Sequence, residues 1–196
     1  GLKIANDICQ ANHQAKVLMV SVELCTLHVQ KSKNIHHGAA AVLIEGNPQQ
    51  KTYLRLQNFY CDILPSSTQE MTWHIGDSGF EMMLTAYVPQ GIKSGIAQFA
   101  EKCLSQQFLH INAIDFYTIH PGGMKILQAC EQALGISKQD NRYAYHVLRE
   151  YGNMSSATVL FVLKIIWDNL AIGDHQKTIF SCAFGPGLTL ESMLLD

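Results

Sequence analysis

Charged residues are scarce in this sequence. Asp, Glu, Lys and Arg make up 15% of its 196 residues, whereas hydrophobic residues make up 47%. A typical globular chain has about 25% charged residues. We therefore expect this chain to bury more surface than a monomer of its size, in an oligomer or against a missing partner segment.

The sequence also lacks a cluster of basic residues and a long hydrophobic run. Its 14 Lys and Arg residues are scattered and its net charge is −2, which argues against a nucleic acid or an anionic membrane as partner. The most apolar stretch runs from Ala157 to Trp167, but Lys164 interrupts it and Asp168 ends it. That stretch is too short to span a bilayer, so no membrane partner is expected.

No cysteine pair has the spacing of a metal site, and the printed sequence contains no signal-peptide pattern. The six cysteines are widely separated: Cys9, Cys25, Cys61, Cys103, Cys130 and Cys182. This pattern indicates reduced thiols in the cytoplasm and not a disulfide framework or a zinc site. His36 and His37 are adjacent, and neighbours on a strand face opposite ways, so no metal is expected there either. The chain begins at Gly1 without a methionine, which suggests a piece of a longer protein.

Hydrophobic periodicity predicts the elements of the first part of the chain. The apolar run KVLMVSVE predicts a strand covered on both faces. A boundary is expected at Pro65-Ser66-Ser67, and strand character from Met71 to Leu84 is broken by Gly76-Asp77-Ser78-Gly79. The predicted elements are a helix over 1–12 and strands over 16–23, 38–45 and 51–64.

The second part alternates helices and strands. Apolar residues occupy nearly every face of the segment 155–170, which predicts a helix buried all round. The order of the elements predicts mixed α/β layers. The other predicted helices cover 89–106, 122–134 (ending at Gly135) and 137–151, and the predicted strands cover 115–120, 177–183 and 188–195 around Gly185-Pro186-Gly187.

The segment Ile119-His120-Pro121-Gly122-Gly123 is the first candidate for chemistry. Pro121 holds the histidine backbone extended, and the two glycines allow a tight turn with free N–H groups at the start of a helix. Helix N-termini attract negative charge, so this corner suits a phosphate, a thioester oxygen or an enolate. The alternative is that His120 ends a strand and the following residues form only a turn.

The second candidate is Asn153, which follows Gly152 and precedes the cap residues Ser155 and Ser156. Asn153 can simply help to cap the helix. It can also converge with His120 on one oxygen atom, where both would donate hydrogen bonds to the charge gained in acyl or enolate chemistry.

The two motifs together carry a family resemblance. His120-Pro121-Gly122-Gly123 and Asn153 lie 33 positions apart, followed by Gly185-Pro186-Gly187-Leu188-Thr189. The runs VLMVSVELCT, GAAAVLIEG and RYAYHVLREYGN add to the pattern. The chain resembles, along essentially its whole length, the type III polyketide synthases of the chalcone synthase type in the thiolase-like superfamily. Ketoacyl synthase III enzymes share the fold but usually have His-Gln-Ala-Asn at the first motif.

The resemblance implies an α/β fold of five layers, αβαβα, built from two similar halves and working as a homodimer. On this basis residues 1–64 are the tail of the N-terminal half, and residues 65–196 are the C-terminal, chalcone synthase-like half. The helices over 1–12 and 155–170 are then the equivalent pair in the central layer.

The resemblance also implies the reaction. In the family an acyl group is loaded from coenzyme A onto a cysteine, and malonyl-CoA is decarboxylated to an enolate that attacks the thioester. His120 and Asn153 would hold the malonyl carbonyl oxygen, and His120 would also stabilise the cysteine thiolate. Acyl-CoA and malonyl-CoA are thus the expected partners, with no further cofactor. The residues expected to bind the substrates are Gly122 and Gly123 beside the pantetheine arm and Gly185, Pro186, Gly187 and Met82 around the elongation cavity.

The expected nucleophile is not found in this chain. The family pattern places it a few residues before Gly1, and Cys9, Cys25 and Cys182 are expected to be small buried hydrophobes. The fragment alone is therefore expected to be inactive. The chain also departs from the family at Ile35-His36-His37, where Phe-Gly-Asp is usual. The alternatives are a non-catalytic thiolase-fold module that acts through self- or partner association, and a ketoacyl synthase III-like acyltransferase.

Overall fold

The computed structural model describes residues 1–23, 38–50, 52–77, 79–171, 173–174 and 177–196. Its first unit is a helix on a pair of strands. Helix α1 (Leu2–Ala11) packs against β1 (Lys16–Glu23) and β2 (Gly38–Glu45), which are antiparallel. The pairing runs from Lys16 opposite Glu45 to Glu23 opposite Gly38. A small core of Ala5, Cys9 and Ile44 joins the helix to the strands.

The second unit is a four-stranded mixed sheet with the order β3-β8-β7-β6. Strands β6 and β7 are parallel, whereas the other neighbours are antiparallel. Most of the buried hydrophobic side chains belong to one core around this sheet, and Phe180, Leu190 and Leu194 are fully buried in it. The strands are β3 (Leu56–Ile63), β6 (Phe116–Ile119), β7 (Ile179–Gly185) and β8 (Thr189–Leu195).

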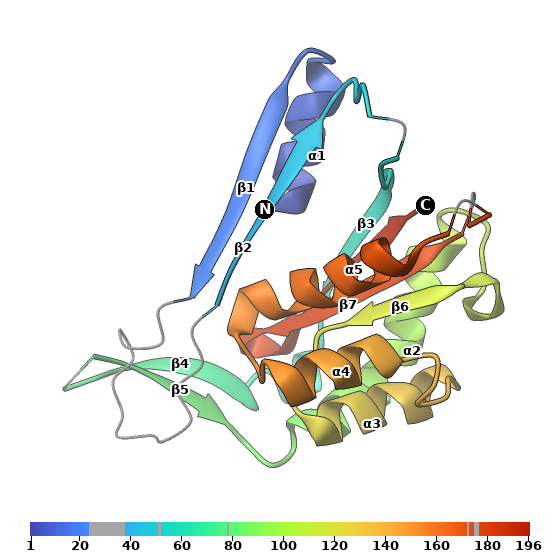
Figure 1. Ribbon diagram of the computed structural model, residues 1–196. Helices are drawn as coiled ribbons and strands as arrows, with labels where there is room; N and C mark the ends of the chain where they lie inside the picture. Colours follow the sequence, from blue (N-terminus) through green and yellow to red (C-terminus); the bar gives the residue numbers. More distant parts are fainter. Residues whose placement is uncertain (24–37, 51, 78, 172, 175–176) are drawn as a thin grey trace.

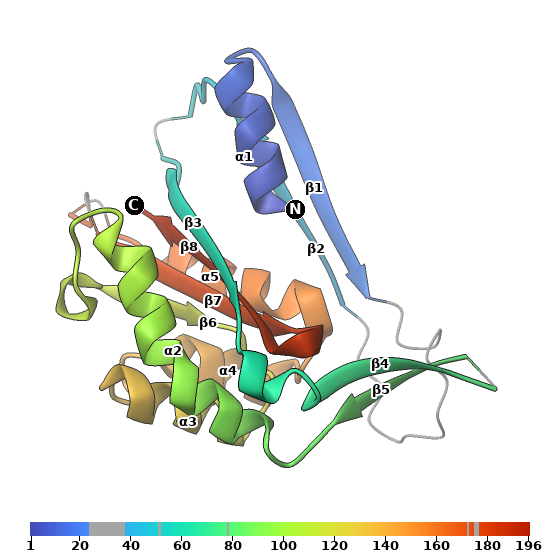
Figure 2. The ribbon, with the colours of Figure 1, turned by 180° about the vertical axis from the view of Figure 1, so that it is seen from behind.

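Helices cover both faces of this sheet (Figures 1 and 2). Helix α2 (Val88–Ser105) lies on one face and contacts α3 (Met124–Leu134). Helix α5 (Thr158–Asn169) lies on the opposite face against β6 and β7, with α4 (Arg142–Glu150) beside it. Helix α3 ends at Gly135, whose φ of 68° is in the left-handed region, as the sequence predicts.

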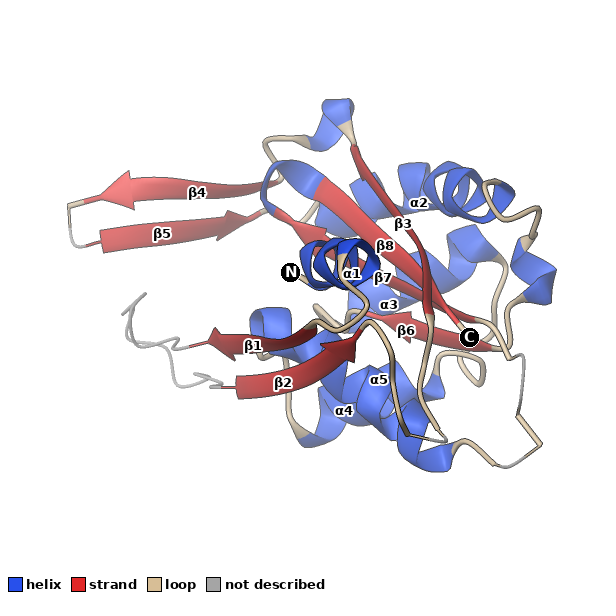
Figure 3. Ribbon diagram, turned by 90° about the horizontal axis from the view of Figure 1, so that it is seen from above, coloured by secondary structure: helices blue, strands red, loops and turns tan. Residues whose placement is uncertain are grey.

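A hairpin of two strands extends away from the rest of the fold (Figure 3). Strands β4 (Met71–Gly76) and β5 (Gly79–Leu84) pair with Gly76 opposite Gly79 at the tip. The break predicted at these glycines is therefore confirmed. Trp73 lies opposite Met82 in this hairpin.

The two largest differences from the predicted element boundaries are the starts of β3 and α4. Strand β3 begins at Leu56 and not at 51, and α4 begins at Arg142 and not at 137. The later start of α4 has a local cause, because the Ser137 N–H and hydroxyl both donate to Asp140 Oδ2 at 2.7 Å and hold a turn.

The prediction that two elements are covered on all sides is wrong for the described residues. Leu18, Val20 and Val22 on the outer face of β1 are each more than half exposed. Helix α5 buries four residues, whereas Lys164 and Asp168 are exposed on its other side. The apolar pattern is present, but the part of the chain that the structure describes supplies no element to cover these faces.

The division of the chain at residue 64 remains a prediction. Strand β3, which precedes that boundary, hydrogen-bonds to β8, which follows it. Among the described helices, we find none that is long and apolar enough to cross a bilayer.

Candidate active site

His120 lies directly after the last residue of β6. Its backbone N–H donates to the Cys182 carbonyl at 2.8 Å, which continues the pairing of β6 with β7 by one residue. The Gly122 N–H then donates to the His120 carbonyl at 2.9 Å. The chain therefore makes a tight turn immediately after the histidine, and this turn leads into α3.

The His120 ring is half-buried beside Gly122. A Cβ atom on Gly122 would lie 3.6 Å from His120 Nε2, which is an ordinary contact distance, and only 3.0 Å from Ile126 Cδ1. The ring therefore lies next to Gly122, and the absence of a side chain there makes room for Ile126. Burial lowers the pKa of His120 to about 4, because the charged ring would lose its hydration. The ring is therefore neutral near pH 7, where its one N–H can donate a hydrogen bond. A charged ring here requires a nearby anion such as a thiolate.

Asn153 reaches the same turn from the other side. Its Oδ1 accepts the Ser155 N–H at 2.9 Å, and because a backbone N–H can only donate, this bond fixes which end of the amide is oxygen. The Asn153 Nδ2 donates to the Gly122 carbonyl at 3.2 Å. An amide nitrogen carries two hydrogens, and no second acceptor is found for it among the described residues. The structure thus brings His120 and Asn153 to one glycine, with a donor available on each.

The backbone around Asn153 has an unusual shape. Gly152 has a φ of 72° and Ser155 a φ of 54°, both in the left-handed region. A glycine suits such a conformation, whereas a serine gives no sign of it in the sequence. A left-handed conformation costs a non-glycine residue about 1–2 kcal/mol, so the surrounding contacts must hold Ser155 in place.

The turn after His120 opens at the N-terminus of α3. The Gly123 carbonyl accepts the N–H groups of Ile126 and Leu127 at 3.1 and 3.2 Å. No acidic side chain lies in the first turn of this helix. The partial positive charge of the helix end is therefore directed at the corner where His120 and Asn153 meet.

The residues predicted to shape a cavity lie near the same edge of the sheet. Gly185, Pro186 and Gly187 link β7 to β8, and Gly187 has a φ of 74°. Strand β4 packs against this turn. Met82, on β5 of the same hairpin, is 44% exposed. Because β6 and β7 are parallel, His120 and the Gly185 turn follow carboxyl ends at one edge.

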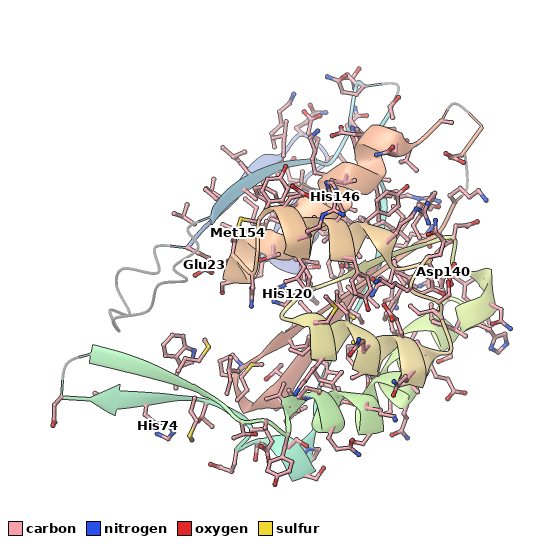
Figure 4. All side chains as sticks on the ribbon, turned by 60° about the horizontal axis from the view of Figure 1, so that its bottom comes forward. Glu23, His74, His120, Asp140, His146 and Met154 are labelled. Atoms are coloured by element: carbon pink, nitrogen blue, oxygen red, sulfur yellow. The ribbon has the colours of Figure 1, made fainter. Side chains whose placement is uncertain are left out.

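Sequence reasoning missed a contact from β1. The Ser156 N–H donates to Glu23 Oε1 at 3.3 Å, and the Ser156 hydroxyl donates to the same oxygen. Figure 4 labels Glu23, Met154 and His120, and the end of β1 that carries Glu23 packs against the turn before α5. The two serines before α5 indicate a capped helix start, but nothing in the sequence points to a cap from a residue 133 positions away.

The described cysteines do not have the character of nucleophiles. Cys9, Cys103, Cys130 and Cys182 are buried, and burial raises the pKa of the Cys103, Cys130 and Cys182 thiols. Cys61 is exposed, but its hydrogen bond to Glu191 raises its pKa to about 11. The thiols with a raised pKa, those of Cys61, Cys103, Cys130 and Cys182, stay protonated at neutral pH. The prediction of buried thiols is confirmed for Cys9 and Cys182, whereas Cys25 lies outside the described residues.

Metal ligands do not gather in the part of the chain that the structure describes. No group of three or more His, Cys, Asp or Glu side chains there could hold an ion. Ile35, His36 and His37 lie outside the described residues.

One family model and several solved structures match this chain. The model of the family "Chalcone and stilbene synthases, C-terminal domain" matches residues 55–196. The crystal structure of PKS-I from the brown alga Ectocarpus siliculosus is 30% identical, with a TM-score of 0.89. The C-terminal type III polyketide synthase domain of Steely1 from Dictyostelium is 29% identical, with a TM-score of 0.86. Tetrahydroxynaphthalene synthase from Streptomyces coelicolor is 26% identical, with a TM-score of 0.87.

These matches cover 99–100% of this chain but 56–57% of the three solved chains. The chain therefore spans a little over half the length of these relatives.

Proposed function

Because the chain belongs to the chalcone and stilbene synthase family through its C-terminal domain, we propose that it is the C-terminal part of a type III polyketide synthase. Such an enzyme is an acyltransferase that condenses malonyl-CoA with an acyl-CoA starter. The family and the layered α/β fold predicted from the motifs are confirmed by the matches. The observation that carries the proposal is the bond of 3.2 Å from Asn153 Nδ2 to the Gly122 carbonyl, beside the His120 ring.

In the proposed reaction, His120 and Asn153 act on the malonyl thioester. The bond to the carboxylate carbon breaks, CO₂ leaves, and the electron pair passes into the enolate, whose oxygen gains negative charge. The neutral His120 ring and the second hydrogen of Asn153 Nδ2 donate to that oxygen. The enolate carbon then attacks the acyl thioester, and the cysteine thiolate leaves. Each lost donor is expected to slow decarboxylation by about two to three orders of magnitude.

The nucleophile is proposed to lie outside this chain. The pKa values of the described cysteine thiols that depart from normal are raised, which is the opposite of what an attacking thiolate needs. We therefore propose that the 196 residues alone do not condense substrates. The whole enzyme would work as a homodimer in the cytoplasm.

The remaining site residues are assigned to substrate binding. Gly122 and Gly123 leave room beside the α3 N-terminus for a pantetheine arm. The turn at Gly185, Pro186 and Gly187 and the side chain of Met82 would border the growing product. Coenzyme A thioesters are substrates in this proposal, and no other cofactor is invoked.

The test is release of CO₂ from malonyl-CoA by the full-length natural protein. We expect the His120→Ala and Asn153→Ala variants to lose about two to three orders of magnitude in kcat. KM should change by about threefold or less, since the lost bonds form mainly in the transition state. His110→Ala, in the loop after α2, serves as the control. Normal decarboxylation by Asn153→Ala would rule out the proposed role.

A second candidate is a non-catalytic module that associates with itself or another polypeptide. The outer face of the β1–β2 pair favours it, because Leu18, Val20, Val22 and Leu43 are 54–63% exposed there. Light scattering tests it: a strictly monomeric chain of 196 residues would count against this function. A ketoacyl synthase III-like activity is disfavoured by Pro121-Gly122-Gly123.

A further inference from the structure

The end of the β1–β2 ladder touches the segment that carries Asn153. Glu23 and Gly38 are paired with each other in the last rung of the ladder. Glu23 accepts two hydrogen bonds from Ser156, and Gly38 lies against Met154. One rung therefore contacts both sides of Ser155, the residue with the left-handed backbone.

The contact at Glu23 supplies an acceptor that the helix start lacks. The N–H groups in the first turn of a helix have no partner within the helix. The Met154 side chain makes no cap hydrogen bond to the turn Ser155–Ala157. Asn153 Oδ1 accepts the Ser155 N–H and the Thr158 hydroxyl accepts the Met154 N–H, which leaves the Ser156 N–H. The Glu23 carboxylate accepts the Ser156 N–H at 3.3 Å, and its negative charge is favoured at a helix N-terminus. Ser21 of the same strand adds a hydrogen bond to the Ser156 hydroxyl.

The contact at Gly38 depends on the absence of a side chain at this position. A Cβ atom at this position would lie 2.6 Å from Met154 Cβ and 2.9 Å from its sulfur. A glycine is thus required for β2 to approach the Met154 side chain so closely. The close approach fixes Met154, the residue between Asn153 and Ser155.

We propose that the last rung of the ladder, Glu23 and Gly38, is a clamp that holds Ser155 in its left-handed conformation and thereby positions the Asn153 amide. The link is direct, because the Ser155 N–H donates to Asn153 Oδ1 at 2.9 Å. If Ser155 returned to an ordinary φ, the segment that carries Asn153 and Met154 would swing relative to α5, and the Asn153 amide would lose its position. Glu23 is in this view a positioning residue that acts through Asn153. The inference rests on the proposed function where it concerns the reaction rate.

The kinetic test uses malonyl-CoA decarboxylation by the full-length natural protein. Glu23→Ala is expected to lower kcat about tenfold to a hundredfold, because a small misplacement of a catalytic group has that effect. KM should stay within about threefold. Glu23→Gln should restore most of the rate, since its amide oxygen still accepts the Ser156 hydrogen bonds. The matched control is Glu45→Ala in the first rung of the same ladder, where Glu45 pairs with Lys16 at 2.6 Å. An equal loss of rate in the control would overturn the inference.

A double variant asks whether Glu23 acts through Asn153. In the Asn153→Ala background, Glu23→Ala should change kcat by about twofold or less, because the group that it positions is already absent. A further tenfold loss in that background would contradict the clamp. If Asn153→Ala alone keeps normal activity, the proposed function fails, and the clamp is then judged by a measurement independent of activity.

That measurement is amide hydrogen exchange in the peptide covering 150–158. Glu23→Ala should speed the exchange of the Ser156 amide about tenfold or more, since it removes the acceptor of that N–H. Glu45→Ala should leave it unchanged. Unaltered exchange in Glu23→Ala would overturn the clamp even if the enzyme decarboxylates malonyl-CoA as proposed.

Discussion

Strands β7 and β1 have similar apolar sequences and different surroundings. Ile179, Phe180 and Cys182 of β7 are at most 1% exposed, between helices on both faces of the sheet. Leu18 and Val20 of β1 are 63% and 56% exposed, although α1 covers the inner face of the same strand. An apolar strand sequence thus predicts that the strand is buried, but its burial depends on which other elements pack against each of its faces. The outer face of β1 is where further protein is expected to pack.

The largest contrast should appear when one leucine is shortened in each region. Leu190→Ala in β8 removes a fully buried side chain and is expected to lower the free energy of unfolding by about 2–5 kcal/mol. Leu43→Ala in β2 removes a side chain that is 57% exposed, and it should change the free energy of unfolding by about 0.5 kcal/mol or less. Urea denaturation of the 196-residue chain measures both. A loss of several kcal/mol at Leu43 would show that this face is covered in solution.

The second contrast concerns how the free energy of unfolding depends on pH, and it is expected for the region of the four-stranded sheet, which contains His120. Burial lowers the pKa of His120 from 6.5 to about 4, so the unfolded chain binds one more proton than the folded chain between these values. The contribution of His120 to the free energy of unfolding is complete above pH 6.5. It is lost as the pH falls toward 4, at about 1.4 kcal/mol per pH unit. The His120→Asn variant should lack this part of the change in unfolding free energy with pH, which denaturation at several pH values measures. Identical slopes in the variant and the original chain would contradict the burial of the ring.

Where the two regions meet, the addition of a single methyl group should lower the free energy of unfolding. Gly38→Ala places a Cβ 2.6 Å from Met154 Cβ, and such overpacking typically costs about 1–3 kcal/mol. Gly185→Ala is the control, because no atom lies within 4 Å of its added Cβ and its φ of −136° suits any residue. Denaturation of both variants gives the difference. Equal stability would mean that the contact between β2 and Met154 is loose.

The smallest expected effect on the free energy of unfolding comes from two exposed ion pairs, one in each region, and should be the same for both. Lys3–Asp7 on α1 and Lys164–Asp168 on α5 are exposed pairs one helical turn apart. Each should contribute about 0.3–0.5 kcal/mol, and salt should weaken both. Double-mutant cycles at low and high salt measure these energies. A clearly larger value for Lys164–Asp168 would mean that the outer side of α5 is shielded from water in solution.

Local patterns accounted for most of the elements. The spacing of apolar residues predicts α2, α3 and the β4–β5 hairpin, and Gly135 marks the end of α3 because a left-handed residue is needed there. The same patterns cannot say which strands become neighbours, and the pairing of β3 with β8 joins residues from Ile63–Thr189 to Leu56–Leu195, far apart in the sequence. They also cannot say which faces are covered.

The candidate site was predictable in part for the same reason. His120 and Asn153 stand in motifs whose glycines indicate special backbone shapes, and the structure places both at Gly122. Glu23 was missed because its bond to Ser156 depends on the docking of two distant units. The conformation of Ser155 was missed because serine carries no preference for a positive φ.

His120 and Asn153 are proposed to hold one substrate oxygen. The most direct measurement is a crystal structure of the full-length natural protein with a malonyl-CoA analogue that cannot lose CO₂. We expect the thioester oxygen to lie about 2.7–3.1 Å from both His120 Nε2 and Asn153 Nδ2. A thioester oxygen bound beyond hydrogen-bond distance of both atoms would contradict it.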